Sequence, residues 1–178
     1  MFELWDMSDG EMQNEEKRAD TPRPQVVCGI DIGYAQFSVC MAHKGQDGEL
    51  KILQWTSDRI AHQDETLVSK FRQMIDYVDD LPRCDVYVIE NQFPFANKDM
   101  IALQYGLLGH LEKKEGRGKV HVVCQSQIKR HYKLARKCWA ENKKAALHFV
   151  RACGHPELRN HNMADSFLLV KYFTEVLQ

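Results

Sequence analysis

The chain has 178 residues, of which 44% are hydrophobic and 28% are charged, a composition typical of a globular domain with its own core. No apolar run approaches the roughly 18 residues that a transmembrane helix requires, and the acidic start excludes a signal peptide or an Arg-rich transit peptide. We therefore expect no association with a membrane. The six cysteines form no CxxC pair, which favours free, buried thiols over a disulfide framework or a zinc site.

The formal net charge of −1 is the sum of two unlike regions. Residues 1–20 contain seven acidic and two basic residues, and Pro22 and Pro24 follow them. We predict a disordered acidic leader over residues 1–24 and one folded domain over residues 25–178. Between Lys113 and Lys144 the balance reverses, with eleven Lys or Arg and two acidic residues. Such a stretch is most often a solvated face, but it can also bind nucleic acid.

Three strands open the predicted domain. Residues 26–33 form an apolar run that ends in glycine, and residues 37–42 and 50–56 read as the next two strands. The connections are so short that these strands must pair antiparallel. An amphipathic helix is predicted over residues 63–78. The strand expected at residues 85–90 is then reached by a helical crossover, which places it parallel to the first strand.

The remaining elements complete a mixed α/β order. We predict a helix at residues 98–114, a strand at 120–124, a basic loop or broken helix at 126–138, and helices at 142–152 and 161–177. The order indicates a five-stranded mixed sheet, its first three strands antiparallel, flanked by helices. Apolar residues of the helix at 98–114 are spread too widely for a single stripe, which allows both a core face and a partner face.

Three carboxylates interrupt segments that are otherwise apolar. Asp31 lies in the first strand, Glu90 ends the fourth, and Asp165 lies in the last helix. Taken singly, each could face solvent. Clustered carboxylates raise one another's pKa unless a divalent cation joins them, and oxygen ligands suit Mg²⁺ or Mn²⁺. Together the three residues predict a metal-dependent phosphodiesterase centre.

The runs that carry these acids resemble a known family. They are Gly29-Ile30-Asp31-Ile32-Gly33, Val88-Ile89-Glu90-Asn91-Gln92 and Asn162-Met163-Ala164-Asp165-Ser166. In order and separation they resemble the ribonuclease H-like Holliday junction resolvases related to RuvC, above all the poxvirus-type and fungal mitochondrial enzymes. The resemblance covers roughly residues 26–176. It implies a homodimeric endonuclease that uses Mg²⁺ to cut two opposed strands of a four-way DNA junction.

The resemblance also assigns roles to residues. It implies that Asp31, Glu90 and Asp165 are metal ligands. The family usually has a fourth acidic ligand three residues before the last Asp, and Asn162 stands there, with a carbonyl oxygen but no charge. His161 could contribute instead. This departure leaves open a weakened metal site, a natural variant or an engineered Asp→Asn change.

The basic stretch supplies the predicted DNA surface. Its candidate phosphate-binding residues are Lys129, Arg130, Lys133, Arg136 and Lys137.

Two further positions are expected to act near the scissile phosphate. Lys143 or Lys144 is expected to offset negative charge there, and the sequence does not choose between them. By the resemblance, Phe93 stacks on an unpaired base near the crossover; the alternative is a core phenylalanine.

Two other functions use the same residues. One is a ribonuclease H-like nuclease that cuts RNA:DNA hybrids. The other is a non-catalytic junction-binding protein with an impaired metal site, which Asn162 favours. For the partners we expect branched DNA and a second copy of the chain, bound through the helix at residues 98–114. The lack of a transit signature favours the cytoplasm, or the host-cell compartment of viral DNA replication, over the mitochondrion.

Overall fold

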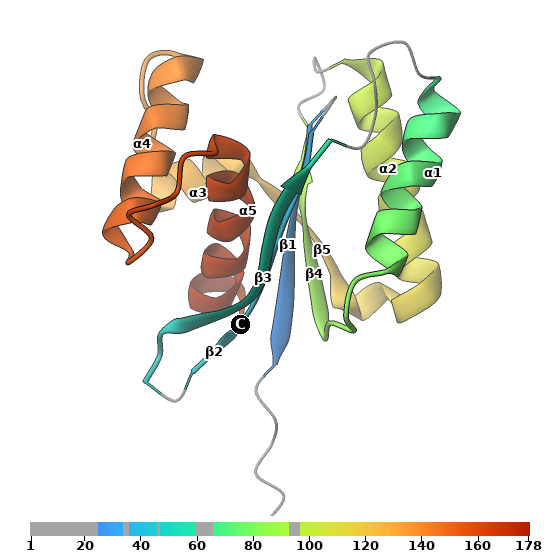
Figure 1. The fold of residues 1–178 in the computed structure, drawn as a ribbon, viewed down its shortest axis with the longest axis horizontal. Helices are drawn as coiled ribbons and strands as arrows, with labels where there is room; N and C mark the ends of the chain where they lie inside the picture. Colours follow the sequence, from blue (N-terminus) through green and yellow to red (C-terminus); the bar gives the residue numbers. More distant parts are fainter. Residues whose placement is uncertain (1–24, 34–35, 46, 60–65, 93–96) are drawn as a thin grey trace, which may run out of the picture.

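The computed structural model describes most of the chain, namely residues 25–33, 36–45, 47–59, 66–92 and 97–178. The predictions for residues 1–24 and for Phe93 lie outside these ranges. The described residues form one five-stranded sheet with helices on both faces (Figure 1). This is the α/β architecture that the sequence predicted.

The sheet has the strand order β3-β2-β1-β4-β5. Its strands are β1 (Val26–Ile32), β2 (Phe37–Lys44), β3 (Leu50–Asp58), β4 (Val86–Asn91) and β5 (Val120–Cys124). The pairs β1–β2 and β2–β3 are antiparallel, whereas β1–β4 and β4–β5 are parallel. The predicted antiparallel start and the crossover to a parallel β4 are both confirmed.

The helices divide between the two faces of the sheet. They are α1 (Leu67–Asp79), α2 (Lys98–Glu115), α3 (Gln125–His131), α4 (Trp139–Ala152) and α5 (His161–Tyr172). Figure 1 shows α1 and α2 on one side of the sheet and α3, α4 and α5 on the other. Two short turns complete the order, a 3-10 turn, η1 (Arg117–Lys119), and a π-helical turn, η2 (Phe173–Leu177).

Two predictions about the last third of the chain need correction. The helix predicted from residue 142 begins at Trp139. Asn142 lies in the first turn, where its Oδ1 accepts a hydrogen bond from the backbone N of Arg136 at 2.6 Å and so holds the preceding loop. The helix predicted to run to residue 177 ends at Tyr172 and continues as η2.

The cysteines were predicted as buried free thiols. All six are free, but Cys138 and Cys153 are exposed and Cys124 is half-buried.

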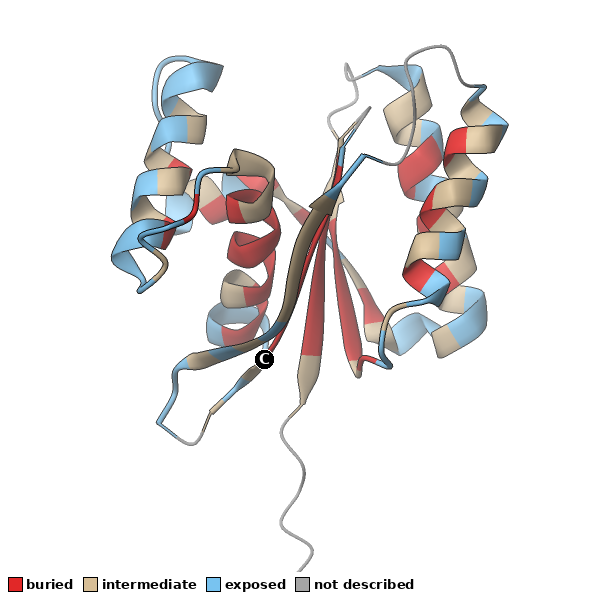
Figure 2. Ribbon diagram, viewed as in Figure 1, coloured by how far each residue is buried: buried red, intermediate tan, exposed pale blue. Residues whose placement is uncertain are grey.

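The alternation of side chains along β1 separates two cores. Cys28, Ile30 and Ile32 pack with α1 and α2, whereas Val27 belongs to the core on the α5 side. Figure 2 shows buried residues on the strands and on the helix faces turned toward them. Since side chains alternate between faces, Gly29 and Asp31 share the α5 side with Val27. The strand therefore directs its one carboxylate toward α5.

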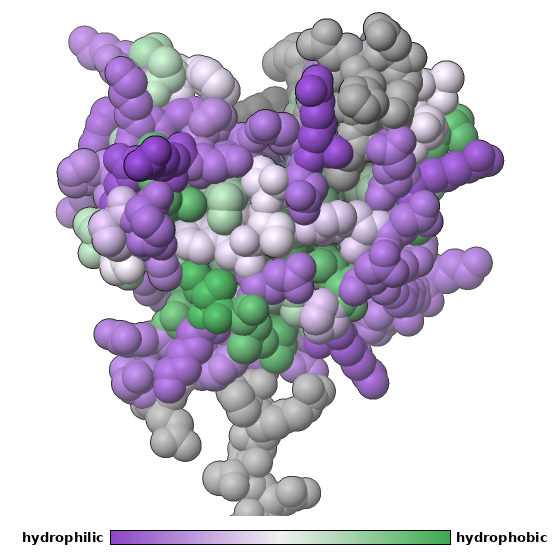
Figure 3. All heavy atoms as spheres, viewed as in Figure 1, coloured by the Kyte–Doolittle hydropathy of each residue, from purple (hydrophilic) through white to green (hydrophobic). Residues whose placement is uncertain are grey.

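The face of the molecule seen in Figure 3 is mostly polar. Hydrophilic residues make up most of it, and the largest group of apolar residues lies below its centre. Among the residues that the structure describes, no helix combines the length and the apolar character needed to cross a bilayer.

Candidate active site

Asp31 and Glu90 meet at one edge of the sheet. In the parallel pair β1–β4, Ile30 lies opposite Ile89, so the two acids occupy the next positions of both strands. Asp31 is only 5% exposed, and Glu90 is half-buried. Val88 packs in the core on the α5 side, and Glu90 shares that face by strand alternation. The carboxyl ends of these strands thus present two acids to the same helix.

Helix α5 brings the third acid close because β1 carries a glycine beneath it. A Cβ built on Gly29 would lie 2.4 Å from the backbone O of Ser166 and 2.8 Å from Cγ2 of Val170. Only glycine permits this approach. Asp165, the neighbour of Ser166, is 1% exposed. From the other side, Trp55 of β3 donates from Nε1 to the backbone O of Met163 at 2.9 Å.

Lys143 of α4 completes the cluster. Its ammonium donates a hydrogen bond to Oδ2 of Asp165 and forms a salt bridge with it, and its side chain is 17% exposed. The other carboxylate oxygen of Asp165, Oδ1, is buried and has no hydrogen-bond partner in the described part of the chain. Among the residues that the structure describes, Lys143 is the cation in direct contact with this group of carboxylates.

Burial and the neighbouring charges shift the pKa values of Glu90, Asp165 and Lys143. Burial and the nearby charge of Asp31 raise the pKa of Glu90 well above its ordinary value. Burial, together with the charge of Asp31, also raises the pKa of Asp165. Burial alone would lower the pKa of Lys143, but the charges of Asp165 and Asp31 outweigh it and raise that pKa. The lysine is held as a cation among carboxylates that burial disfavours as anions.

The fourth predicted ligand lies on the same helix, one turn before Asp165. Asn162 donates from Nδ2 to Oε1 of Gln36, and its backbone N binds Oδ1 of the helix cap Asn160 at 2.9 Å. An amide that donates through Nδ2 keeps Oδ1 as an acceptor. His161, the alternative contributor, lies with its ring edge-on to Trp139 at 6.1 Å between centroids.

The donors of this site are oxygens, which suit a hard divalent cation. Within the described ranges, no three acidic, histidine or cysteine side chains form a group ready to hold a metal ion. Lys143 already engages one of the donors, Oδ2 of Asp165. The unpartnered Oδ1 of Asp165 and the raised pKa of Glu90 both show that more positive charge would stabilise the cluster. Oxygen donors of this kind fit Mg²⁺ or Mn²⁺.

A buried amide network, which the sequence analysis missed, fixes the end of β4. Gln104 of α2 is 2% exposed; its Oε1 accepts from the backbone N of Gln92 at 2.6 Å, and its Nε2 donates to Oδ1 of Asn91 at 3.2 Å. Gln92 donates from Nε2 to the backbone O of Ile32 at 3.2 Å. The network ties β4 to β1 directly beyond Glu90 and Asp31. A glutamine among the leucines of α2 was the available signal.

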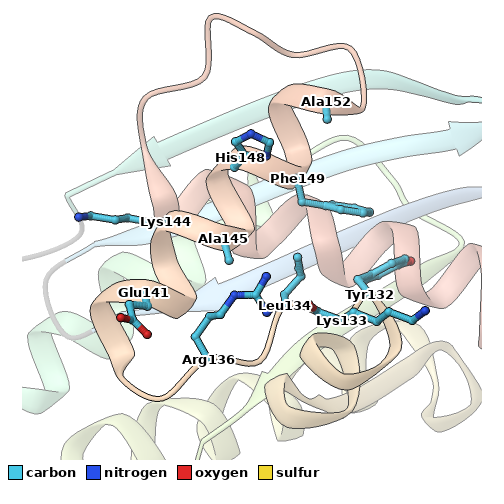
Figure 4. Close-up of a pocket in the computed structure, with 10 residues that line it drawn as sticks. All are labelled: Tyr132, Lys133, Leu134, Arg136, Glu141, Lys144, Ala145, His148, Phe149 and Ala152. Atoms are coloured by element: carbon cyan, nitrogen blue, oxygen red, sulfur yellow. Dashed lines mark hydrogen bonds between the residues drawn. The ribbon is translucent and has the colours of Figure 1, made fainter.

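The predicted cations of the basic stretch do not converge on one spot. Lys129, Arg130 and Lys137 line a cavity of about 400 Å³ between the starts of α3 and α4. Lys133 and Arg136 line a larger cavity of about 680 Å³ between the end of α3 and α4 (Figure 4).

The two candidate lysines of α4 differ in position. Lys144 is exposed and, in Figure 4, extends outward from α4 at the rim of the larger cavity. Lys143 contacts Asp165. The geometry therefore selects Lys143 as the lysine beside the carboxylates.

The fold has known counterparts among solved structures. Thermus thermophilus RuvC matches with a TM-score of 0.63 and 16% identity, over 82% of this chain and 90% of that one. The yeast mitochondrial Holliday junction resolvase Ydc2 gives a TM-score of 0.61 and 15% identity, over 85% of this chain and 79% of Ydc2. This chain has the fold of the RuvC-type Holliday junction resolvases.

A third counterpart is the fowlpox virus resolvase, solved with substrate Holliday junction DNA. It matches with a TM-score of 0.56 and 15% identity, over 86% of this chain and 99% of the viral one. No protein-family model matches the sequence, and no curated protein matches it significantly. At these identities the likeness establishes the ribonuclease H-like fold, and the activity has to be argued from the site.

Proposed function

We propose that this chain is a DNA endonuclease that resolves four-way junctions by metal-dependent hydrolysis of phosphodiester bonds. The observation that carries the proposal is the meeting of Asp31, Glu90 and Asp165 at one sheet edge, with Lys143 against them. The same fold occurs in resolvases from a bacterium, a yeast and a poxvirus. Fold and site thus support the same class of reaction.

The carboxylates are the proposed ligands of Mg²⁺, with Mn²⁺ as a substitute, and the amide oxygen of Asn162 is a further candidate ligand. A cation held there would polarise the scissile phosphate and activate the attacking water. Asp31 and Asp165 are buried and Glu90 is half-buried, and this limited contact with water strengthens the charge interactions within the cluster. Gly29 and the Gln104 network hold the acid-bearing elements in fixed positions.

Lys143 is the proposed cation for charge that develops on the phosphate. Its ammonium stays protonated because the carboxylates raise its pKa. Beside the scissile phosphate, such a fixed charge stabilises the transition state more than the ground state. The exposed Arg130, Lys133 and Lys137 then bind flanking phosphates without reading sequence. Arg136 is less free, because its guanidinium donates to the backbone O of Lys133 at 2.9 Å and of Ala135 at 3.0 Å.

We further propose that two copies associate through α1 and α2. An apolar cavity of about 240 Å³ lies between these helices, lined by Leu67, Val68, Phe71, Ala102, Leu103 and Gly106. Val68 is 58% exposed and Tyr105 is 63% exposed. This surface lies across the sheet from the carboxylates, so a dimer formed there leaves both sites open to one junction.

Sedimentation tests the dimer directly. At micromolar concentration the wild-type chain should sediment as a dimer, and Val68→Asp should shift it toward the monomer. A wild-type chain that sediments as a monomer contradicts the proposed association.

Cleavage of a substrate panel tests the activity. The panel is a synthetic four-way junction, a linear duplex of the same sequence and an RNA:DNA hybrid, each with Mg²⁺ or with EDTA. We expect paired, symmetric cuts in the junction with Mg²⁺ and little cutting elsewhere. Preferred cutting of the hybrid would instead make the chain an RNA:DNA hybrid nuclease.

A second candidate is a junction-binding protein without catalysis. Asn162 in place of an acid and the salt bridge of Lys143 to Asp165 favour it, because both weaken the site as a metal centre. Junction binding in EDTA with no cut in either Mg²⁺ or Mn²⁺ would establish this reading. Asn162→Asp should keep or raise cleavage if residue 162 belongs to the metal shell, and a sharp loss would remove it from that shell.

A further inference from the structure

The cavity of about 400 Å³ between the starts of α3 and α4 is lined by cations and by one aromatic side chain. Its lining comes from the start of α3 and from the loop and first turn of α4: Gln125, Ser126, Lys129, Arg130, Ala135, Lys137, Cys138, Trp139 and Asn142. Three of these side chains are cationic and none is acidic. The volume falls within the range of small-molecule sites and exceeds that of one nucleobase.

Trp139 is the flat wall of this cavity. Its side chain is 67% exposed, the most exposed large hydrophobic side chain among the described residues. The ammonium of Lys143 lies 5.6 Å from the ring centroid, and His161 meets the ring edge-on. Because Lys143 also binds Asp165, a single side chain separates the indole from the carboxylates. A group stacked on Trp139 would therefore lie close to Lys143 and the carboxylate that it contacts.

The side-chain amide of Gln125 gives a second, independent indication that this cavity binds a polar ligand. It is 3% exposed, and neither Nε2 nor Oε1 has a hydrogen-bond partner in the described ranges. An amide offers two donors and an acceptor, the combination with which proteins read base edges. Lys129, one turn further along α3, lines the same cavity and places a cation beside the buried amide.

We propose that this cavity is a nucleobase subsite. An unpaired base of the branched DNA stacks on Trp139, its phosphate lies against Lys129 and Arg130, and the amide of Gln125 turns to meet the polar edge of the base. The subsite gives the enzyme a sequence preference at the cut. This inference rests on the proposed function, and it assigns Trp139 and Gln125 to specificity, separate from the metal ligands.

The test uses a four-way junction with 2-aminopurine at successive positions around the crossover, in EDTA so that no strand is cut. With the wild-type chain, stacking should quench the fluorescence at one position. Trp139→Ala should abolish that quenching and weaken junction binding roughly 5- to 100-fold, whereas Trp139→Phe should keep part of both. Leu53→Ala, which removes an exposed apolar side chain of the edge strand β3, should leave both unchanged.

A second measurement addresses Gln125 with a junction library randomised at the crossover and cut in Mg²⁺. Gln125→Met keeps the shape of the side chain without the amide, so it should flatten the wild-type sequence preference while the thermal midpoint is kept. An unchanged preference would overturn the role of Gln125. Quenching that persists in Trp139→Ala, or a slower cut with unchanged binding and quenching, would overturn the stacking role and leave Trp139 as support for Lys143. A wild-type chain that does not bind the junction would overturn the proposed function itself.

Discussion

The two faces of the sheet use the same strands for different purposes. On the face covered by α1 and α2, β1 contributes Cys28, Ile30 and Ile32, all buried among apolar neighbours. On the face covered by α5, the alternate positions of the same strand are Val27, Gly29 and Asp31. On the first face, β1 contributes only apolar side chains to the core. On the second face, an acid takes the place of an apolar side chain near the end of the strand. Substitutions at neighbouring residues of β1 should therefore affect different properties, stability on one face and cleavage on the other.

The sharpest contrast is between Asp31 and Ile30. Asp31→Asn removes the charge of a proposed metal ligand and should reduce junction cleavage roughly 100- to 1,000-fold with little loss of stability. Ile30→Val removes one buried methylene and should lower the free energy of unfolding by about 0.5–1.5 kcal/mol with cleavage nearly unchanged. Single-turnover cleavage rates and urea unfolding measure the two effects. Equal rates for Asp31→Asn and the wild type would remove Asp31 from the site.

The two adjacent lysines of α4 give the next contrast. Lys143→Met should reduce cleavage about 100-fold, because it removes the fixed cation beside Asp165. It should also destabilise the metal-free protein by roughly 1–3 kcal/mol, because a buried carboxylate loses its partner. Lys144→Met removes an exposed charge and should change both quantities little. Thermal unfolding in EDTA and cleavage in Mg²⁺ measure them; equal effects of the two substitutions would contradict the placement of Lys143.

Two glycines test how far the site depends on the close packing of α5. Gly29→Ala places a methyl group 2.4 Å from the backbone O of Ser166, so it should push α5 off β1, cost about 1–3 kcal/mol of stability and lower cleavage through the displaced Asp165. Gly109→Ala in α2 meets open space and should be neutral or stabilise by up to about 1 kcal/mol. Urea unfolding compares the pair. If Gly29→Ala were as stable and active as Gly109→Ala, the close approach would not matter to the site.

The smallest expected effect concerns pH. Because burial and Asp31 raise the pKa of Glu90 in the folded state, the folded chain binds this proton more tightly than the unfolded chain does. That contribution to stability is fully present below the ordinary pKa of glutamate and is lost as the pH rises through the raised value. In the metal-free protein the contribution of Glu90 to stability should therefore fall as the pH rises above about 4, and the wild type should lose stability relative to Glu90→Gln.

Added Mg²⁺ should restore the stability lost at the higher pH. Glu90→Gln should flatten the dependence on pH and reduce the effect of Mg²⁺. Thermal midpoints between pH 4 and 8, with EDTA or with Mg²⁺, provide the measurement. The same dependence on pH in the wild type and in Glu90→Gln, both in EDTA, would contradict the raised pKa of Glu90.

Much of the fold was open to prediction from the sequence because it depends on local pattern. The strand order follows from the apolar runs, from the short connections between β1, β2 and β3, and from the crossover through α1. The same crossover places Asp31 beside Glu90. The start of α4 was predicted at residue 142, three residues late. In the structure the helix begins at Trp139, and the side chain of Asn142 in its first turn binds the backbone of Arg136. Such a contact with the preceding loop is tertiary and leaves no local pattern in the sequence.

The candidate site shows the same limit. The three acids stand out in the sequence because each interrupts an apolar segment. The choice of Lys143 over Lys144 depends on the rotation of α4 against α5, which a pair of adjacent lysines does not reveal. Gln104 and Gln125 are polar residues at buried positions. Only the packed structure shows that the side chain of Gln104 has its partners and that the side chain of Gln125 has none among the described residues.

The most direct test of the central claim is Mn²⁺ binding, measured by isothermal titration calorimetry without DNA. If Asp31, Glu90 and Asp165 form one metal site, the wild-type chain should bind Mn²⁺, and Asp165→Asn should weaken binding at least about tenfold, in line with the loss of a charged ligand. Lys143→Met should bind Mn²⁺ more tightly than the wild type, because the competing ammonium is gone. Equal Mn²⁺ affinity of the wild type and Asp165→Asn would contradict the assignment of these carboxylates as a metal centre.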